Sequence, residues 1–483
     1  MQKPNDARVK ANETQSAINT KDVAMIARPF LWKNTVRVIV YDIRDINNIK
    51  QIRKVEVDGN AMATRKIGDM LYLVSNDYLN YYSENIAKIT PSYVDTAVGD
   101  GYINIDYADI HYLKNSIKSS YMILTAMNLE NVKTPATIYT CLGGGGNIYM
   151  SKENLYISAE DNNRYINNTL MPEKVAAVDK TNIYKFQLKD GKFEFMAKGQ
   201  VNGTVLNQFS MDENNNYFRI ATTTNSAWNA NGEVGSKNNV YILDAELKLK
   251  GKLEDMAIGE KIYSVRFMGD KGYVVTYKNI DPLFVIDLKD ASNPSILGQL
   301  KIPGYSSYLQ PYDENHIIGI GKDTQEVDGR VTESGVKLSL FDVADYKNPK
   351  EKFSTVIGDA GTSSEAIYNH KALLFSKDMN ILAFPISVMI NGGNVENKGI
   401  YSKQVFQGAY VYNIDLVNGF KLRGTITHLL PTDVNIDGYV SGYDRNIQRI
   451  LFIDEMLYTI SNDVIMANDF NDLFFKNKII IGK

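Results

Sequence analysis

A short strand in which apolar side chains alternate with others recurs along the whole chain. Each copy ends in a polar residue, Asp, Asn or Gln, that is followed at once by an apolar one. The eight copies carry this polar residue at Asp42, Asn128, Gln187, Asp244, Asp287, Asp342, Asp415 and Asp469. Most intervals between copies are about 43 to 59 residues, which is typical of a small repeated sheet.

Each copy is followed by three further strand patterns. The next strand ends in glycine, where a left-handed or tight backbone is easiest, as in residues 51–59 and 295–304. A hairpin of two strands then follows, as in residues 261–277. Four strands per repeat at this spacing predict an all-β fold, a β-propeller of four-stranded blades. We count eight blades, with seven and nine as alternatives.

One domain accounts for nearly the whole pattern. Alternation with a period of two disfavours α/β folds and helical solenoids, so residues 22–483 are predicted to form a single β-propeller domain. The polar residues 1–21 are expected to be disordered or to take part in ring closure. The first repeat begins at its second strand, residues 22–30, and its innermost strand is not evident. That strand comes from the N-terminal segment, or is missing, or residues 473–481 close the ring in another way. Insertions are expected at about 77–120, 321–335 and 391–406.

Composition and charge narrow the functional classes. The chain has 44% hydrophobic and 11% aromatic residues, which is ample for a packed core. Its 53 basic and 56 acidic residues provide no electrostatic footprint for nucleic acid. No apolar run approaches the roughly 18 residues of a membrane span, so no transmembrane segment is expected. The single cysteine, Cys141, excludes an intrachain disulfide and a cysteine-based zinc site.

Long contiguous stretches resemble a known family. They are LGGGGNIYMSKENLYIS (142–158), GEKIYSVRFMGDKGYVVTYKNIDPLFVIDL (259–288), LGQLKIPGYSSYLQPYDENHIIGIGKD (297–323), LSLFDVADYKNPKE (338–351) and SEAIYNHKALLFSKDMNILAFPI (364–386). These stretches resemble secreted bacterial and archaeal proteins with a C-terminal β-propeller distantly related to WD40, and the resemblance covers roughly residues 22–480. It implies export, a propeller fold and, for most members, no established biochemical function.

The N-terminus bears on localisation. Residues 1–22 are polar and lack the basic, apolar and small-residue order of a secretory signal, so the protein is either cytoplasmic or has lost a leader. Members of the family usually carry a leader and additional N-terminal strands, which this sequence lacks. From the resemblance we expect an extracellular or cell-surface protein whose leader has been removed.

The insertion at 77–120 is the most distinctive local feature because it is rich in Tyr and Asp. Loops of this length are usually functional or mobile. Tyrosine offers a rigid apolar face with a polar tip, which suits recognition of sugar rings or protein surfaces. Tyr82, Tyr107 and Tyr112 are therefore predicted to bind a ligand. The alternative is a loop folded over one face of the ring.

The axis of the predicted ring is a second candidate region. The innermost strands of a propeller converge there, and polar groups from several blades meet. Strand position alone selects five channel-facing residues, Tyr263, Arg266, Tyr308, Glu365 and Arg449.

No catalytic or cofactor motif stands out. The glycines at 143–146 lack the Lys-Ser/Thr ending of a phosphate loop and lead into a strand, which indicates a turn between blades. The four histidines have no paired spacing and no nucleophile motif accompanies them; His370 is expected to pack within its blade. No cofactor is predicted. Calcium is the one metal to consider, with Asp433, Asn435 and Asp437 as weak oxygen ligands, and turn chemistry is the alternative for these residues.

The Tyr-rich insertion and the lack of catalytic motifs favour a non-enzymatic binding scaffold, and the resemblance implies that it is extracellular or at the cell surface. We expect a monomer that binds a protein or a cell-surface glycan. The alternative is an extracellular polysaccharide- or peptide-processing hydrolase or lyase with its site at the channel mouth. A cytoplasmic WD40-like hub is a third hypothesis, which the resemblance to exported proteins disfavours. A shared fold does not decide among them.

Overall fold

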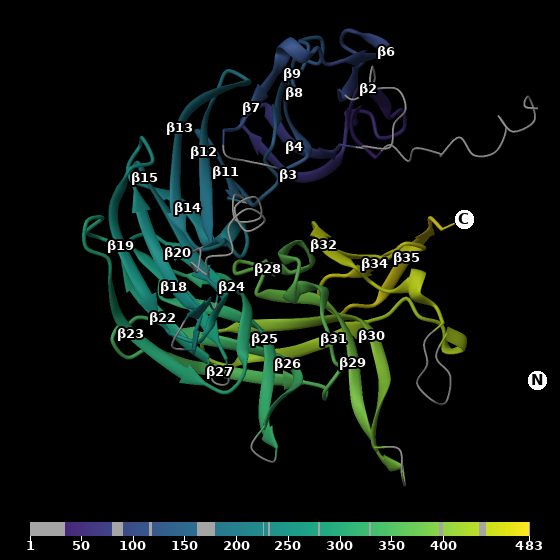
Figure 1. Cartoon of the computed structure of the whole chain (residues 1–483). Coiled ribbons are helices and arrows are strands. Elements are labelled where there is room, and N and C mark those ends of the chain that lie inside the picture. Colours follow the sequence, from purple (N-terminus) through teal and green to yellow (C-terminus); the bar gives the residue numbers. More distant parts are fainter. Residues whose placement is uncertain are drawn as a thin grey trace, which may run out of the picture.

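Eight sheets, antiparallel except for one edge strand, are arranged around a common axis (Figure 1). The computed structural model describes residues 34–79, 90–114, 118–161, 179–225, 227–229, 232–278, 281–327, 330–395, 399–433 and 441–482. Seven of these sheets have four strands and one has five. The prediction of an all-β propeller with eight blades is therefore confirmed.

The first two sheets depart from a simple succession of strands. The first sheet has the strand order β1 (Thr35–Asp42), β2 (Lys50–Asp58), β5 (Ser92–Asp95) and β6 (Gly99–Asn104). The second sheet has the order β3 (Asn60–Ile67), β4 (Met70–Tyr78), β8 (Ser120–Asn128), β9 (Thr137–Leu142) and β7 (Ile110–Tyr112), where β7 runs parallel to β9.

The third to eighth sheets each contain four antiparallel strands. The third sheet consists of β10 (Ile148–Met150), β11 (Asn154–Glu160), β12 (Lys180–Lys189) and β13 (Lys192–Asn202). The fourth consists of β14 (Met211–Asn214), β15 (Tyr217–Thr224), β18 (Lys237–Leu243) and β19 (Leu249–Met256), with a hairpin of β16 (Ala227–Asn229) and β17 (Gly232–Val234) between its middle strands. The fifth consists of β20 (Lys261–Met268), β21 (Lys271–Tyr277), β22 (Asp281–Asp287) and β23 (Ser295–Ile302).

The last three sheets continue the same order. The sixth consists of β24 (Tyr305–Asp313), β25 (His316–Val327), β26 (Arg330–Asp342) and β27 (Lys350–Ile357). The seventh consists of β28 (Leu374–Ser376), β29 (Ile381–Val395), β30 (Gly399–Asp415) and β31 (Gly419–Ile426). The eighth consists of β32 (Arg449–Ile453), β33 (Met456–Ile460), β34 (Val464–Asp469) and β35 (Phe475–Ile480). The helical elements among the described residues are short 3₁₀ turns, η3 (Tyr107–Asp109), η4 (Gln208–Ser210), η5 (Glu365–Ile367), η6 (His370–Ala372), η7 (Pro431–Asp433) and η8 (Tyr443–Arg445).

Seven apolar clusters lie between the eight sheets, one at each junction. Successive side chains of a strand point to opposite faces of its sheet, so alternate residues pack against the preceding sheet and the following sheet. In β21, Tyr273 and Val275 pack against the sixth sheet, whereas Val274 packs against the fourth. The inner sheets are thus buried on both faces, and the hydrophobic core is a series of layers around the axis.

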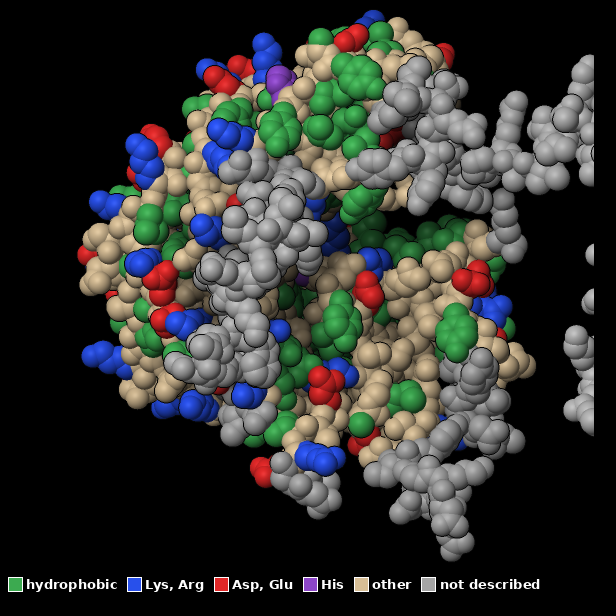
Figure 2. All heavy atoms as spheres, in the orientation of Figure 1, with side chains coloured by type: hydrophobic (Ala, Val, Ile, Leu, Met, Phe, Trp, Pro, Cys, Tyr) green, Lys and Arg blue, Asp and Glu red, His purple; other side chains and the backbone are tan. Residues whose placement is uncertain are grey.

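The two end sheets are covered on one face only. Ile450 and Phe452 of β32 pack against the seventh sheet, so the intervening side chains of the strand point the other way. Leu451 and Ile453 on that second face are 36% and 56% exposed, and Ile479 of β35 is 60% exposed. Within the described part of the chain, no apolar cluster joins the eighth sheet back to the first. Figure 2 shows hydrophobic side chains inside the hollow between the two ends of the arc.

The structure shows which strands of a blade the first repeat and the C-terminal residues supply. β1 and β2 correspond to the third and fourth strands of a blade, and residues 22–30 and 1–21 lie outside the described residues. β35 pairs with β34, so residues 475–480 form the outermost strand of the eighth sheet. Among the described strands, the C-terminal one therefore completes its own blade.

The three insertions add ordered strands. The Tyr-rich insertion returns to the first sheet through β5 and β6, and then adds β7 to the outer edge of the second sheet. Its described part therefore includes strands that are paired to the first two sheets. The other two insertions lengthen the β25–β26 and β29–β30 hairpins, whose strands stay paired along most of their length.

Candidate functional site

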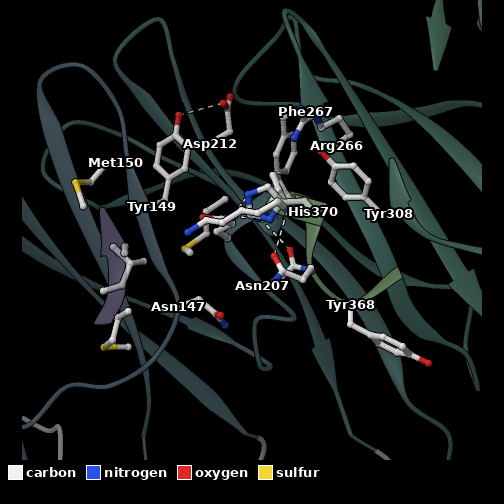
Figure 3. A pocket seen from close by; sticks show the side chains of 18 of the residues that line it. Asn147, Tyr149, Met150, Asn207, Asp212, Arg266, Phe267, Tyr308, Tyr368 and His370 are labelled. Carbon is white, nitrogen blue, oxygen red and sulfur yellow. Dashed lines mark hydrogen bonds between the residues drawn. The ribbon is translucent and has the colours of Figure 1, made fainter. Parts of the chain in front are cut away.

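A cavity of about 770 Å³ lies on the axis where the innermost strands converge, and we call it the axial cavity (Figure 3). Its lining comes from β3, β10, β14, β20 and β24, and from the 3₁₀ turns η4, η5 and η6. Six consecutive sheets, or the turns leading into them, therefore contribute to one site. A volume of this size is within the range of about 300–1,000 Å³ that is usual for ligand sites.

Three short turns bring side chains to the axis. Asn207 begins η4 by accepting a hydrogen bond from the backbone N–H of Phe209 at 2.9 Å. Ser364 and Asn369 begin η5 and η6 in the same way. Short polar side chains favour this local capping over a continued strand. The turns replace the start of the innermost strand and place Phe209 and His370 on the cavity wall.

The glycine run before β10 is structural. Gly143, Gly144 and Gly145 have φ angles of 87°, 111° and 81°, which side-chain-bearing residues rarely adopt. Gly146 has a different constraint, because a Cβ atom there would lie 1.5 Å from the backbone oxygen of Ser158. The run therefore forms the tight connection between the second and third sheets, as the sequence indicated, and brings β10 to the cavity.

Aromatic rings and a cation gather on one wall of the axial cavity. The guanidinium carbon of Arg266 lies 5.0 Å from the ring centroid of Phe209. The Phe209 ring also contacts Tyr308, with centroids 5.2 Å apart, and meets His370 edge-on at 4.9 Å. The Tyr308 hydroxyl donates a hydrogen bond to Gln310 Oε1 at 2.9 Å. This wall combines an apolar surface with a fixed positive charge.

Positive charge prevails over negative charge in the described lining. Its cationic residues are Arg65, Arg266 and Lys371, and none of them forms an ion pair with another described residue. The lone carboxylate of the lining as described is Asp212, which is bound by Arg219 and accepts a hydrogen bond from the Tyr149 hydroxyl at 3.3 Å. The cavity therefore attracts anions.

Two titratable groups of the wall stay neutral near pH 7. Burial lowers the pKa of His370, and the charges of Lys371 and Arg266 lower it further. Burial raises the pKa of Tyr308, although the neighbouring Arg266 opposes this rise. Gln208 Nε2 lies 3.4 Å from a ring nitrogen of His370. The positive charge of the wall is therefore carried by Arg266 and Lys371 rather than by the imidazole.

The structure separates the five residues that were expected to face the channel. Arg266 and Tyr308 line the axial cavity. Glu365 and Arg449 line a second cavity of about 470 Å³ between the seventh and eighth sheets, where Arg449 Nη1 lies 3.9 Å from Glu365 Oε1. Tyr263 belongs to neither lining and packs instead against the rings of two other tyrosines, Tyr277 and Tyr305.

The tyrosines predicted in the insertion lie on the outside. Tyr107 in η3 and Tyr112 in β7 are both exposed, and neither lines the axial cavity. Tyr82 lies outside the described residues. Ligand binding by these tyrosines stays a prediction, at a place separate from the axial cavity.

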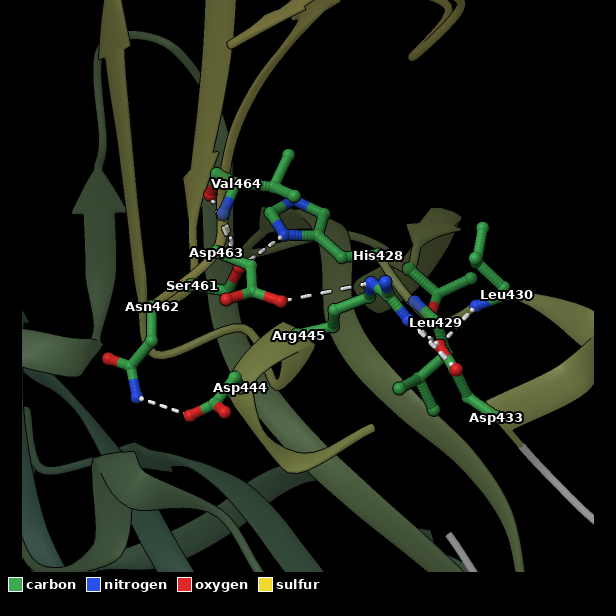
Figure 4. A network of polar contacts seen from close by, with 11 residues as sticks. His428, Leu429, Leu430, Asp433, Asp444, Arg445, Ser461, Asn462, Asp463 and Val464 are labelled. Carbon is green, nitrogen blue, oxygen red and sulfur yellow. Dashed lines mark hydrogen bonds and ion pairs between the residues drawn. The ribbon is translucent and has the colours of Figure 1, made fainter. Parts of the chain in front are cut away.

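The described part of the predicted calcium turn is already engaged. Both carboxylate oxygens of Asp433 accept from Arg445 Nη1 at 2.8 Å, and Oδ2 also accepts from the backbone N–H of Leu430 at 2.8 Å (Figure 4). The hydrogen bond from the Leu430 N–H lowers the pKa of the Asp433 carboxyl below its usual value, and Arg445 lowers it further. Asn435 and Asp437 lie outside the described residues, and the described residues contain no cluster of three or more metal-binding side chains. Calcium binding at this turn stays a prediction.

Sequence reasoning missed part of the cavity wall. Phe209 was not singled out, and His370 was expected to pack within its blade, yet both line the axial cavity. The available signal was the pair of Asn-x-x segments, Asn207 to Phe209 and Asn369 to Lys371, in which the asparagine caps a turn. A capped turn at the start of a blade marks a place where side chains can face the axis.

Comparison with known proteins identifies the family. A model of the β-propeller domain family matches residues 2–473. The chain belongs to this family. The propeller is 37% identical over 304 residues to an uncharacterized protein of Methanocaldococcus jannaschii, an alignment that covers 62% of this chain and 40% of that protein. It is 34% identical over 319 residues to an uncharacterized protein of Archaeoglobus fulgidus, with 66% and 41% covered. These alignments span about two fifths of the relatives' own length.

Solved structures with some similarity include two other proteins. The WD40 domain of Neurospora crassa Pan2 is 9% identical, with a TM-score of 0.34 and coverage of 68% of this chain and 76% of that chain. BamB from Moraxella catarrhalis is 10% identical, with a TM-score of 0.35 and coverage of 69% of this chain and 72% of that chain.

The part of the propeller that the structure describes has no helix of sufficient length and apolarity to span a bilayer.

Proposed function

We propose that this β-propeller is a non-enzymatic binding scaffold that holds a protein segment or a glycan in the axial cavity. The observation that carries the proposal is the convergence of six consecutive sheets on one cavity of about 770 Å³ with an aromatic and cationic wall. Ligand sites typically combine apolar walls with a few placed polar groups. Rigid strands also hold such groups more precisely than loops do.

The charges of the cavity favour binding over polymer hydrolysis. Glycosidic hydrolysis commonly needs two carboxyl groups about 5 to 10 Å apart. The described lining contributes one, Asp212, and its oxygens are occupied by Arg219 and Tyr149. Glu365 lines the second cavity and lies next to Arg449. The hydrolase hypothesis therefore has no specific support from the geometry of this cavity.

A thermal-shift screen tests the proposal. Wild-type protein and a Ser307→Trp variant, which fills the axial cavity from β24, are screened against neutral and acidic glycans and against peptides. A ligand at about 100 times its dissociation constant adds roughly 2.7 kcal/mol of stability. We expect at least one ligand to stabilise the wild type and not the variant. A ligand that stabilises both equally, or no stabilisation by any member of the panel, would contradict the proposal.

We also propose that the protein works outside the cytoplasm, as a monomer. The support for the location is the resemblance of long contiguous stretches, such as residues 259–288, to exported propeller proteins, and this resemblance is independent of the cavity. Fractionation of source cells followed by protease treatment of intact cells tests the location, and light scattering tests the oligomeric state. Recovery from the cytoplasm alone would refute the first part, and a stable dimer the second.

A further inference from the structure

The axial cavity contains a cation whose charge has no counterpart in the described structure. Arg266 is half-buried at the cavity wall, whereas Arg65 and Lys371 are exposed. No described carboxylate lies within ion-pair distance of Arg266. A partly enclosed charge without a counter-charge is costly unless an anion from elsewhere balances it.

The position of Arg266 suits a planar anion. One face of its guanidinium lies over the Phe209 ring at 5.0 Å. The N–H donors of a guanidinium lie in its own plane, so packing on a ring face leaves them directed sideways. Two parallel N–H donors match the two oxygens of a carboxylate, and such bidentate pairs are among the stronger hydrogen-bonded contacts.

Hydrogen-bonding groups for hydroxyls line the same cavity. Asn207 uses its oxygen to cap η4, while its amide nitrogen donates to no described residue. The hydroxyl of Ser307 likewise has no hydrogen-bond partner among the described residues. Tyr368 is also a lining residue, but its ring points away from the cavity and is 79% exposed (Figure 3). Amide and hydroxyl groups bind sugar hydroxyls.

We infer that the axial cavity selects an acidic oligosaccharide and that Arg266 binds a uronate carboxylate of this ligand. The inference rests on the proposed function and adds the chemical class of its ligand. Lys371 and Arg65 contribute general attraction for the anion from their exposed positions. An acidic peptide shares the carboxylate but not the ring of hydroxyls, and it is therefore the competing outcome of the test.

The decisive experiment compares one oligosaccharide with free carboxylates and the same oligosaccharide with its carboxyl groups methyl-esterified. Calorimetric titration of the full chain uses linear tetragalacturonate and its fully methyl-esterified form, with tetraglutamate as the peptide probe. We expect tetragalacturonate to bind at least tenfold more tightly than the ester, and to lose this advantage as salt is raised. Equal binding of acid and ester to the wild type would overturn the inference, and so would binding of tetraglutamate without tetragalacturonate.

Variants assign the selectivity to Arg266. Arg266→Gln should bind acid and ester equally, whereas Arg330→Gln, an exposed arginine on β26, should keep the wild-type preference. Lys371→Gln, which changes an exposed side chain, should weaken acid binding severalfold. Retained selectivity in Arg266→Gln, with circular dichroism that matches the wild type, would overturn the inference. Unaltered binding of tetragalacturonate to Ser307→Trp would instead refute the proposed function, because the ligand would then lie outside the axial cavity.

Discussion

We predict that His428 makes the stability of the propeller sensitive to mild acid. It follows β31 of the seventh sheet, and its ring is buried against the eighth sheet. Its Nδ1 lies 3.0 Å from Ser461 Oγ (Figure 4). Its Nε2 lies 2.8 Å from Thr459 Oγ1. Burial lowers the pKa of His428 from 6.5 to about 4, so the folded protein keeps the imidazole neutral.

The sign and size of the effect follow from this shift. The folded-state pKa lies below the unfolded value, so the stabilisation is complete above pH 6.5 and is lost progressively as the pH falls toward 4. Each pKa unit corresponds to 1.36 kcal/mol, so His428 should cost the folded state about 2 kcal/mol at pH 5 relative to pH 7.5. That loss is a considerable part of the stability of an ordinary domain.

Urea unfolding at pH 7.5 and pH 5 measures the effect. His428→Gln should be less stable than the wild type at pH 7.5, because its amide replaces the ring imperfectly, but its stability should change about 2 kcal/mol less between the two pH values. His111→Gln, at an exposed histidine, should retain the full wild-type pH dependence. If wild type and His428→Gln lose equal stability between pH 7.5 and 5, the neutral buried imidazole is not the cause and the reasoning is wrong.

Three further predictions concern buried groups elsewhere in the propeller. Arg53 donates to both oxygens of Asp95, and both side chains are buried, so Arg53→Met should cost about 3–5 kcal/mol in urea unfolding because it leaves a buried carboxylate unpaired. Gly146→Ala should lower the melting temperature, because its Cβ would lie 1.5 Å from the Ser158 backbone oxygen. Burial raises the pKa of Cys141 to about 12, so its thiol should not react with Ellman's reagent at pH 8 until urea unfolds the chain.

Matched controls keep these results interpretable. Lys54→Met, at a half-buried position next to Arg53, should lower the free energy of unfolding far less than Arg53→Met does. An equal loss in both variants would show that the buried Arg53–Asp95 pair is not the cause. Gly101→Ala meets no atom within 4 Å and should leave the melting temperature nearly unchanged. Rapid labelling of the folded chain would contradict the buried position of the thiol.

The repeating strands could be predicted from sequence because their cause is local. The third strand of each blade is recognisable from its alternating side chains and its terminal polar residue. Eight such strands predicted the eight sheets that the structure contains. The course of the Tyr-rich insertion depends on distant partners instead. Arg53 and Asp95 are 42 residues apart, and only the folded arrangement reveals that their pairing fixes β5 beside β2.

The axial cavity was predictable in part for a similar reason. Innermost strands are recognisable from their place in the repeat, which was enough to find Arg266 and Tyr308. Tyr263 was misplaced because the register of β20 against β21 shifts between Ile262 and Ser264, and such a bulge changes which face a side chain occupies. His370 was missed because a 3₁₀ turn has no alternation to read.

The layered core has a consequence for synthesis on the ribosome. The buried residues of each apolar cluster come from two neighbouring sheets, so a sheet can pack against the preceding one as soon as it has emerged. The axial cavity is different, because its wall includes β3 and the turns that precede β28. A nascent chain therefore acquires most of its folding energy before it acquires a complete site, and ligand affinity would report that the last of these segments has taken its place.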